Sequence, residues 1–545
     1  MNRPQGRPCS HGADPFDIVR PNVVGSRLGL GPRGIDGLFG PGSRRLAHGQ
    51  AEENPKDLMR RASTGVVGLD AILGGGLLVE RLYLLEGPPG AGKTTMGLQF
   101  LLEGVGRGER VLYLALSETA EETQLAAEAH GWSLDGVVVH EMPAVRAADA
   151  PDEGNTIFHH AEVELGETIG EIREQVRRHK PDRVVVDSLS ELRLLAGDSI
   201  RFRRQMLGLK RFMNSQQCTA LMLDDCRGEG ELTINSLAHG VIHMALNTPE
   251  FGGDRRQIRV VKMRGFDFAA GFHDFAVRRG GVVVFPRLIA ADYRTIGKPS
   301  MATTGLEGLD TMLGGGLQAG TCTLLMGTTG TGKSTLGLRC AVAAAERGER
   351  AAVYVFDERP QTMYQRCASL GIDLERYVDA GLIQLQQVDP AELTPGEFAH
   401  LVRRAVDEQA VKLLLIDSLA GYLNAMSADR YVMLQMHELL AYLGQRDVTT
   451  LMVHSQAGLL GHVNGAAHIS YLADNVLLFV FCEVDGQLRQ AVSAFKNRSG
   501  DHGRAFRRLE MEDGCLRVGE QLSGYGGLLA HSLEPAMSRH ANAAE

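Results

Sequence analysis

Two short stretches of the sequence have the residue types and spacing of a phosphate-binding loop. The stretch GPPGAGKTT runs from Gly87 to Thr95, and GTTGTGKST runs from Gly327 to Thr335. Both fit the pattern G-x-x-x-x-G-K-[ST], in which glycines let the backbone curl so that successive N–H groups face a phosphate. The helix expected after each loop adds its positive N-terminal end to the same site. We therefore expect two nucleotide sites in one chain.

The lysine and the hydroxyl residue of each loop have distinct expected roles. Lys93 and Lys333 should reach the β- and γ-phosphates, and Thr94 and Ser334 should ligate Mg²⁺. A glycine turn with a surface lysine is the alternative for one isolated match, but both matches follow an apolar strand and precede a helix. The predicted nucleotide-binding residues are Gly87, Gly90, Gly92, Lys93, Thr94 and Thr95 in the first loop, and Gly327, Gly330, Gly332, Lys333, Ser334 and Thr335 in the second.

Two aspartates end apolar runs later in the sequence. Asp187 closes DRVVVD, and Asp417 closes VKLLLID. An acid at the carboxyl end of a parallel strand lies beside the phosphate loop, where it can hold Mg²⁺ through water. A helix N-cap is the alternative role for each of them.

The acids after the second strand differ between the two halves of the chain. The first half reads LALSETA, with Ser117 and Glu118, and the second reads YVFDERP, with Asp357 and Glu358. A carboxylate near the γ-phosphate can orient and activate a water or a hydroxyl for in-line attack. A solvated loop acid is the alternative for each position.

Pairs of cations separated by one residue appear near the end of each half. They are Lys262 with Arg264, and Lys496 with Arg498. On a strand, residues i and i+2 point the same way. Two cations on one face could meet the γ-phosphate bound by a neighbouring subunit, as an arginine finger does. An ordinary exposed basic strand is the alternative.

These motifs belong to a tandem duplication. STGVVGLDAILGGGL begins at Ser63 and TTGLEGLDTMLGGGL begins at Thr303, and the same offset of 240 residues separates Lys93 from Lys333. Later landmarks keep their order with small changes in spacing. We divide the chain into a flexible N-terminal extension (1–54), a first repeat (55–294), a second repeat (295–520) and a C-terminal tail (521–545).

Each repeat alternates short apolar strands with helical segments. The expected strands lie at 81–87, 110–116, 182–187 and 219–224 in the first repeat, and at 321–327, 351–357, 411–417 and 449–454 in the second. Residues 94–105 carry a helical pattern. Continuous apolar strands between helices predict an α/β fold, in which a mainly parallel sheet has helices on both faces.

Composition narrows the class of protein. The chain has 545 residues and a net charge of −9, which argues against broad nucleic-acid binding. Its eight cysteines form no Cys-x-x-Cys pair, so neither a zinc site nor a disulfide framework is indicated. No apolar run approaches the ~20 residues of a membrane-spanning helix, and no secretory signal is evident. We expect a cytoplasmic protein that does not bind membranes.

Taken together, the paired loops, the Thr-Gly-x-x-Gly-Leu-Asp opening, the strand-end Asp-Ser and the Lys-x-Arg pairs resemble the KaiC family of tandem RecA-like ATPases, over about residues 60–520. The resemblance implies two RecA-like P-loop NTPase domains, a double-ring hexamer with ATP at subunit interfaces, and slow hydrolysis in the first ring. It also implies autophosphorylation of a Ser-Thr pair in the second ring. That pair matches Ser470 and Tyr471 within HISYLADNV (468–476), so one hydroxyl acceptor is kept and the other is a phenol.

The leading hypothesis is a Mg²⁺-dependent homohexameric ATPase with Ser470 as phosphoacceptor and with clock-type or signalling roles. The first repeat, in which Ser117 replaces an acid, would chiefly hold the ring together, and the second would carry phosphoryl transfer. A signalling kinase or a response regulator is the partner that the family implies. Two alternatives stay open: a RecA/RadA-like DNA-dependent ATPase, and a scaffold that nucleotide organises without catalysis.

Overall fold

The computed structural model describes most of both repeats. The described residues are 60–142, 157–225, 232–249, 252–289, 300–389, 391–425, 432–456, 470–484, 487–498, 500, 502–512 and 514–522. The N-terminal extension, the boundary between the repeats at 294/295 and nearly all of the C-terminal tail lie outside them. No helix within the described ranges is long and apolar enough to cross a bilayer.

The first repeat is built on a nine-stranded sheet with the order β11-β10-β9-β8-β3-β7-β6-β4-β5. The strands from β5 to β8 are parallel, and β9, β10 and β11 add antiparallel to one edge. The strands are β3 (Leu82–Gly87), β4 (Val111–Ala115), β5 (Val137–Glu141), β6 (Arg183–Asp187), β7 (Thr219–Asp225), β8 (Gly240–Asn247), β9 (Arg255–Met263), β10 (His273–Arg278) and β11 (Gly281–Phe285).

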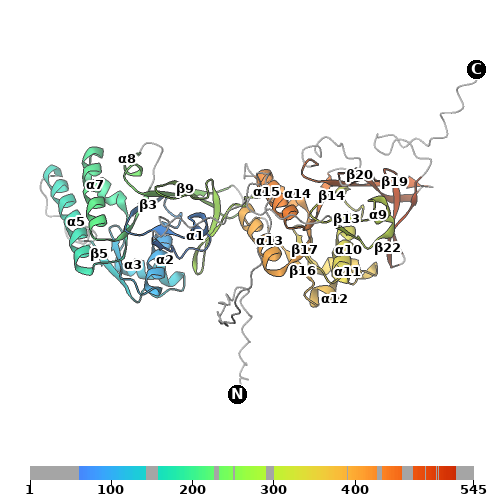
Figure 1. The fold of residues 1–545 in the computed structure, drawn as a ribbon, viewed down its shortest axis with the longest axis horizontal. Helices are drawn as coiled ribbons and strands as arrows, with labels where there is room; N and C mark the ends of the chain where they lie inside the picture. Colours follow the sequence, from blue (N-terminus) through green and yellow to red (C-terminus); the bar gives the residue numbers. More distant parts are fainter. Residues whose placement is uncertain are drawn as a thin grey trace, which may run out of the picture. The chain divides into compact units, whose positions relative to one another are not determined.

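Helices cover both faces of this sheet, and each face has its own buried apolar cluster. The short helix α1 (Leu69–Ile72) packs on one face with α2 (Lys93–Gly106) and α3 (Ala120–Ala129), and α5 (Ile157–His179), α6 (Leu189–Ala196) and α7 (Ser199–Ser215) pack on the other. Figure 1 shows α5 and α7 side by side on their face. A further short helix, α8 (Leu232–Asn235), precedes β8.

The second repeat has the same architecture. Its sheet has the order β16-β15-β17-β18-β14-β19-β20-β21-β22, with parallel pairing from β16 to β19. The strands are β14 (Cys322–Thr328), β15 (Arg350–Val355), β16 (Ile383–Gln387), β17 (Val411–Asp417), β18 (Thr449–Gln456), β19 (Asn475–Val484), β20 (Gln487–Asn497), β21 (Arg507–Glu512) and β22 (Cys515–Gln521).

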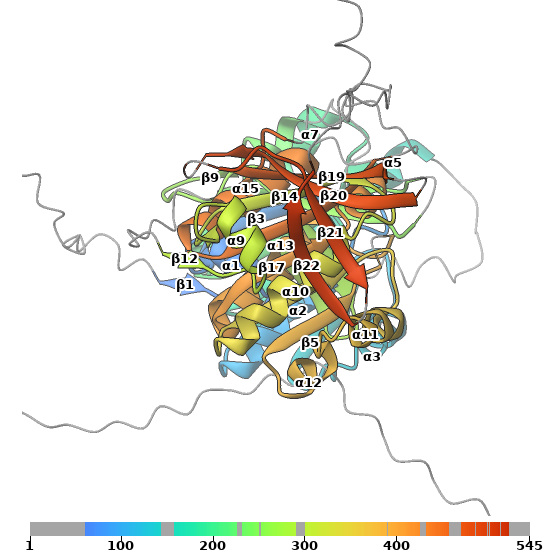
Figure 2. The same ribbon diagram turned by 90° about the vertical axis from the view of Figure 1, so that its right-hand side faces the viewer.

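One face of the second sheet packs on α9 (Glu307–Met312), α10 (Lys333–Glu346), α11 (Pro360–Ser369) and α12 (Leu374–Asp379), and the other on α13 (Pro395–Gln409), α14 (Leu419–Ala425) and α15 (Val432–Gln445). Figure 2 shows the antiparallel pair β21 and β22, and α9 lies beside β22. The mainly parallel sheets and the helices on both of their faces confirm the predicted α/β fold of two tandem units. The three antiparallel strands that each sheet adds at one edge were not predicted.

The repeated opening motif is structural. In the first repeat, Asp70 accepts hydrogen bonds from the Ser63 hydroxyl (2.7 Å), the Thr64 hydroxyl (2.7 Å) and the Thr64 backbone N–H (2.9 Å). Asp310 accepts from Thr304 in the same way in the second repeat. The motif ties the entering chain, paired through β1 (Arg61–Ala62) with β2 (Leu77–Leu78) and β12 (Met301–Ala302) with β13 (Leu317–Gln318), to the short helix that follows.

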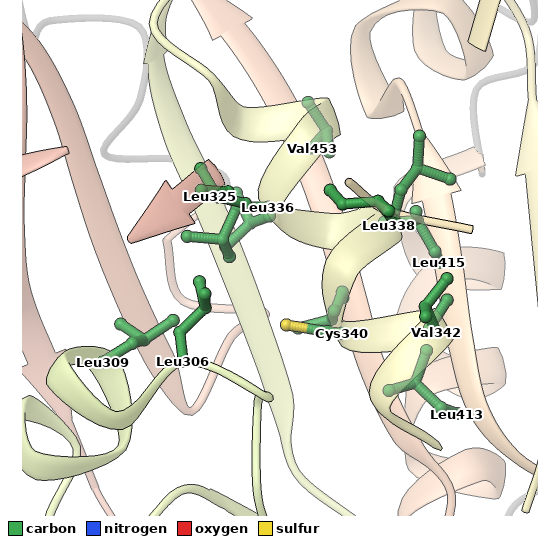
Figure 3. Packing of buried hydrophobic residues seen from close by; sticks show 14 of the residues in the cluster. Leu306, Leu309, Leu325, Leu336, Leu338, Cys340, Val342, Leu413, Leu415 and Val453 are labelled. Carbon is green, nitrogen blue, oxygen red and sulfur yellow. The ribbon is translucent and has the colours of Figure 1, made fainter. Parts of the chain in front are cut away.

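The core under α10 shows how the helix after the phosphate loop is seated. In Figure 3, Leu338 and Val342 of α10 lie against Leu413 and Leu415 of β17. A Cβ on Gly337 would lie only 2.8 Å from the Leu415 side chain, so the helix backbone approaches the sheet closely here. This close packing holds the start of α10 at the carboxyl edge of the strands.

We predict that Leu415→Ala lowers the free energy of unfolding of the second repeat by about 2–5 kcal/mol, because it opens a cavity under α10. Leu434→Ala, at a side chain that is 53% exposed, is the matched control and should change it by less than about 0.5 kcal/mol. Urea denaturation followed by circular dichroism measures both. Equal effects of the two substitutions would contradict this account of the core.

Candidate nucleotide site

The two phosphate loops begin where the central strand of each sheet ends. Gly87 is the last residue of β3, and a Cβ there would lie 2.5 Å from the Met244 carbonyl oxygen on β8. The loop ends at Gly92, which has a φ of 99° and caps the N-terminus of α2. Glycine is needed at position 87 because the backbone of β8 approaches it closely, and at position 92 because the backbone there is left-handed. Gly327 and Gly332 occupy the same places in the second repeat.

The loop lysine of the first repeat is buried and fully engaged. The Lys93 ammonium donates to the carbonyl oxygens of Gly87 and Pro88, both at 2.9 Å. It also forms an ion pair of 2.7 Å with Asp225, the last residue of β7. The loop thus curls around a cation that already has one carboxylate partner.

The loop lysine of the second repeat has a different environment. Lys333 donates to the carbonyl oxygen of Thr328 at 2.6 Å. Burial lowers the pKa of Lys333 to about 8, and the nearby Asp417 carboxylate opposes that shift only in part. An incoming phosphate would therefore stabilise the charged form of this ammonium.

The strand-end aspartates lie beside the loop hydroxyls. Asp187 accepts from the Thr94 hydroxyl at 2.6 Å and from the Tyr113 hydroxyl at 2.8 Å, and burial raises its pKa. Asp417 is hydrogen-bonded with Ser334, and burial raises the pKa of Asp417 to about 6. Each repeat thus brings one carboxylate and one hydroxyl together at the start of its helix.

This donor set fits Mg²⁺, which takes oxygen ligands and is commonly held by few protein groups together with substrate phosphates. One oxygen of Asp417, Oδ2, is buried and has no hydrogen-bond partner within the described part of the chain, so a cation or its water has an acceptor to meet. The same described residues contain no group of three or more His, Cys, Asp or Glu side chains able to hold a metal.

The acids after the second strand have different neighbours in the two repeats. Glu118 is partly buried, and its pKa is raised by burial and then by the carboxylates of Asp187, Glu122 and Asp225. In the second repeat, Glu358 forms an ion pair of 2.5 Å with Arg366 of α11. Asp357 accepts from the Ser418 hydroxyl at 2.6 Å. The raised pKa of Glu118 makes it a stronger proton acceptor than an ordinary glutamate. Asp357 and Glu358 instead are held by a hydrogen-bond partner and an ion-pair partner.

The paired cations lie near the amino ends of the parallel strands, whereas the phosphate loop of the same repeat lies at their carboxyl ends. Lys262 and Arg264 donate to the adjacent carbonyl oxygens of Asn235 and Ser236. The Arg264 backbone N–H donates to His239, which in turn pairs with Leu82 at the start of β3. The phosphate loop begins at the other end of β3, which has six residues. At about 3.3 Å per residue, the loop is roughly 20 Å from the strand end where Arg264 and His239 lie. These cations therefore do not meet the phosphate loop of their own repeat.

The second pair of cations supports the segment that holds Ser470. The Lys496 ammonium donates to the carbonyl oxygens of Ser470 (2.9 Å) and Ala473 (2.6 Å), and Arg498 lies 3.7 Å from Asp474. A cavity of about 250 Å³ adjoins this turn, and Tyr471 and Arg498 both line it. Residues 468 and 469 of the HISYLADNV segment lie outside the described residues.

Several residues in contact with the site were not predicted. They are Tyr113, Asp225, Arg366 and Ser418. Asp225 repeats the pattern of an acid at the end of an apolar strand and could have been found by that signal. Ser418 belongs to the strand-end Asp-Ser motif, but its contact with Asp357 could not be predicted. That contact, like those of Tyr113 and Arg366, depends on which elements are neighbours in space.

Comparison with known proteins agrees with this geometry. A family model described as "ATPase: KaiC" matches residues 62–289 and again residues 302–523. The chain is 25% identical over 480 residues to the "Circadian clock protein KaiC3" of Synechocystis, covering 87% of this chain and 94% of that protein. It is 24% identical over 480 residues to the "Circadian clock oscillator protein KaiC" of Picosynechococcus, covering 87% and 92%. The chain therefore belongs to the KaiC ATPase family.

We predict that the two loops bind nucleotide independently enough to be removed one at a time. The full chain should bind two ATP molecules, and Lys93→Ala or Lys333→Ala should each leave one, because the ammonium is the main cation at the phosphates. Quantification of nucleotide retained after desalting measures this. Lys180→Ala, at a lysine outside both loops, is the control and should retain two; loss of both nucleotides in either loop variant would contradict the prediction.

Proposed function

We propose that this KaiC-family ATPase is a Mg²⁺-dependent homohexamer in which the second repeat phosphorylates Ser470 of the same protein. The chain would divide into an extension, two repeats and a tail at 54/55, 294/295 and 520/521. The first repeat would bind ATP between subunits and chiefly hold the ring together. The observation that carries the proposal is the position of Lys496, which supports the carbonyl of Ser470 at the sheet edge opposite the phosphate loop.

The second-repeat residues have roles in phosphoryl transfer that follow from their contacts. Lys333 would clamp the β- and γ-phosphates, and Ser334 with Asp417 would hold Mg²⁺, which supplies charge neutralisation at the phosphates. Asp357 or Glu358 would take the proton of the acceptor hydroxyl. The Ser470 oxygen would then bond to the γ-phosphorus while the bond to the bridging oxygen breaks and ADP leaves with its electron pair.

Transfer between subunits is favoured because Ser470 and the second-repeat phosphate loop lie at opposite edges of one sheet. The Asn475 end of β19 pairs with the beginning of β14, whereas the loop follows the end of β14. An acceptor at the first edge therefore needs ATP bound by another copy. Arg498 lines the cavity beside Ser470 and would meet the γ-phosphate of that neighbour, as Lys262 and Arg264 would in the first ring.

The physiological role follows from the relatives. The similar proteins carry the names of circadian clock components, and we extend to this chain a role in clock-type or signalling regulation. A signalling kinase or a response regulator is the partner class that we propose, with the protein in the cytoplasm. A DNA-dependent motor of the RecA/RadA type is disfavoured by the net charge of −9.

We predict phosphate on Ser470 after the purified protein is incubated with Mg-ATP, and its loss in Asp357→Ala/Glu358→Ala, because the double variant lacks a proton acceptor. Intact-mass and phosphopeptide analysis measure both. Glu375→Ala, at an acid outside the site, is the control and should keep the phosphate.

Unphosphorylated Ser470 with continuing ATP hydrolysis would contradict the kinase and leave an ATPase switch. Tight ATP binding with turnover near zero would favour a nucleotide-organised scaffold instead. Stimulation of turnover by single-stranded DNA would favour a recombination-type motor.

A further inference from the structure

We infer that Asp225 is the second carboxylate of the first-repeat phosphate site, and that it helps Glu118 to orient the water that attacks the terminal phosphate. The inference rests on the proposed function in one respect, that the first repeat binds ATP. It goes beyond that function because it gives this repeat hydrolytic chemistry in spite of Ser117.

Strand pairing identifies the residue of the second repeat that is equivalent to Asp225. Asp225 of β7 pairs with Gly87, the first glycine of its loop, and Ser455 of β18 pairs with Gly327, the first glycine of the other. The position therefore carries an acid in the first repeat and a hydroxyl in the second. At the position after the second strand the two residue types are exchanged: the first repeat has the hydroxyl residue Ser117, and the second has the acid Asp357.

The contacts of Asp225 place it where the terminal phosphate would be bound. Its Oδ1 lies 2.7 Å from the Lys93 ammonium, the group that reaches the β- and γ-phosphates in loops of this type. Its Oδ2 accepts from the Ser190 hydroxyl at 3.2 Å. The Asp225 side chain is 26% exposed, so water has access to it.

The exchange of positions has a steric reason. In the second repeat, Asp357 lies against Gly421, where a Cβ would be 2.8 Å from its Oδ1. Counted from the strand-end aspartates, Glu191 of the first repeat stands where Gly421 stands in the second. By the same geometry, an aspartate at position 117 would meet the Cβ of Glu191, and the first repeat carries its second acid on β7 instead.

The electrostatics suit a pair in which Glu118 is the base. Burial and the carboxylates of Asp187, Glu122 and Asp225 all raise the pKa of Glu118, so it accepts a proton more readily than an ordinary glutamate. Asp225 would accept one hydrogen bond from the attacking water. The water oxygen bonds to the γ-phosphorus, its proton passes to Glu118, and the bond to the bridging oxygen breaks with the electron pair on ADP.

The test uses the full chain with Asp357→Asn/Glu358→Gln, which silences the second repeat but leaves Lys333 in place. Phosphate release at saturating ATP and equilibrium ATP binding are measured in this parent and with Asp225→Asn added. A positioned proton-transfer network contributes about 10²–10⁴-fold. We expect Asp225→Asn to lower turnover at least roughly tenfold. ATP binding should be unchanged or tighter, because Lys93 loses a competing partner.

Three further variants guard against a trivial loss of structure. Asp225→Glu should restore part of the turnover. Adding Ser117→Asp/Glu191→Gly to Asp225→Asn copies the arrangement of the second repeat and should restore turnover as well. Ser455→Ala, at the equivalent position of the silenced repeat, is the matched control and should change nothing in the first.

Each remaining outcome decides the matter. Unchanged or faster turnover with tighter ATP binding in Asp225→Asn would overturn the inference, because Asp225 would then only compete with phosphate for Lys93. Lower turnover that neither Asp225→Glu nor the copied arrangement restores would overturn it also. If the Asp357→Asn/Glu358→Gln chain binds ATP in its first repeat but does not hydrolyse it, the inference about Asp225 is wrong and the proposed function stands. If the first repeat of that chain binds no ATP, the proposed function is contradicted.

Discussion

A lysine ammonium buried at the carboxyl end of a parallel strand is the interaction on which both repeats depend. Its burial is unfavourable unless carbonyl oxygens, a carboxylate or a phosphate surround it. The curled loop supplies carbonyl oxygens to the lysine ammonium. The close packing of α10 on β17 fixes the start of the helix, and the parallel strands bring the acids to the same ends of the sheet.

The two repeats satisfy this constraint differently. Lys93 has the carboxylate of Asp225 as an ion-pair partner, whereas Lys333 has a lowered pKa and a carbonyl partner. The acids after the second strand also have different surroundings, since Glu118 has acidic neighbours and Glu358 forms an ion pair with Arg366. Duplication therefore kept the fold and the loop while the carboxylates around the phosphates were redistributed. That redistribution gives the two phosphate loops different charged surroundings.

Prediction from sequence was accurate where contacts follow from local order. The strand 411–417 has the predicted limits, and the helix expected at 94–105 spans Lys93–Gly106, because continuous apolar runs and a glycine-rich loop are strong local signals. The strand-end acids were found for the same reason. Among the extra antiparallel strands, Arg255–Met263 was missed because polar and apolar residues mix in it. Asp225 also ends an apolar strand, so the same signal could have found it. Its contact with Lys93 could not be predicted, because it depends on the pairing of β3 with β7, which lie far apart in sequence.

A mixed ring tests most directly whether ATP held by one subunit phosphorylates Ser470 of its neighbour. Chains with Lys333→Ala keep Ser470 but lack a functional second loop, and chains with Ser470→Ala have the reverse defect. The two are mixed with Mg-ATP, and phosphate on Ser470 of the Lys333→Ala chain is measured by mass spectrometry. We predict phosphate on that chain only in the mixture. No phosphate in the mixture, with normal phosphorylation of the unsubstituted protein, would contradict transfer between subunits.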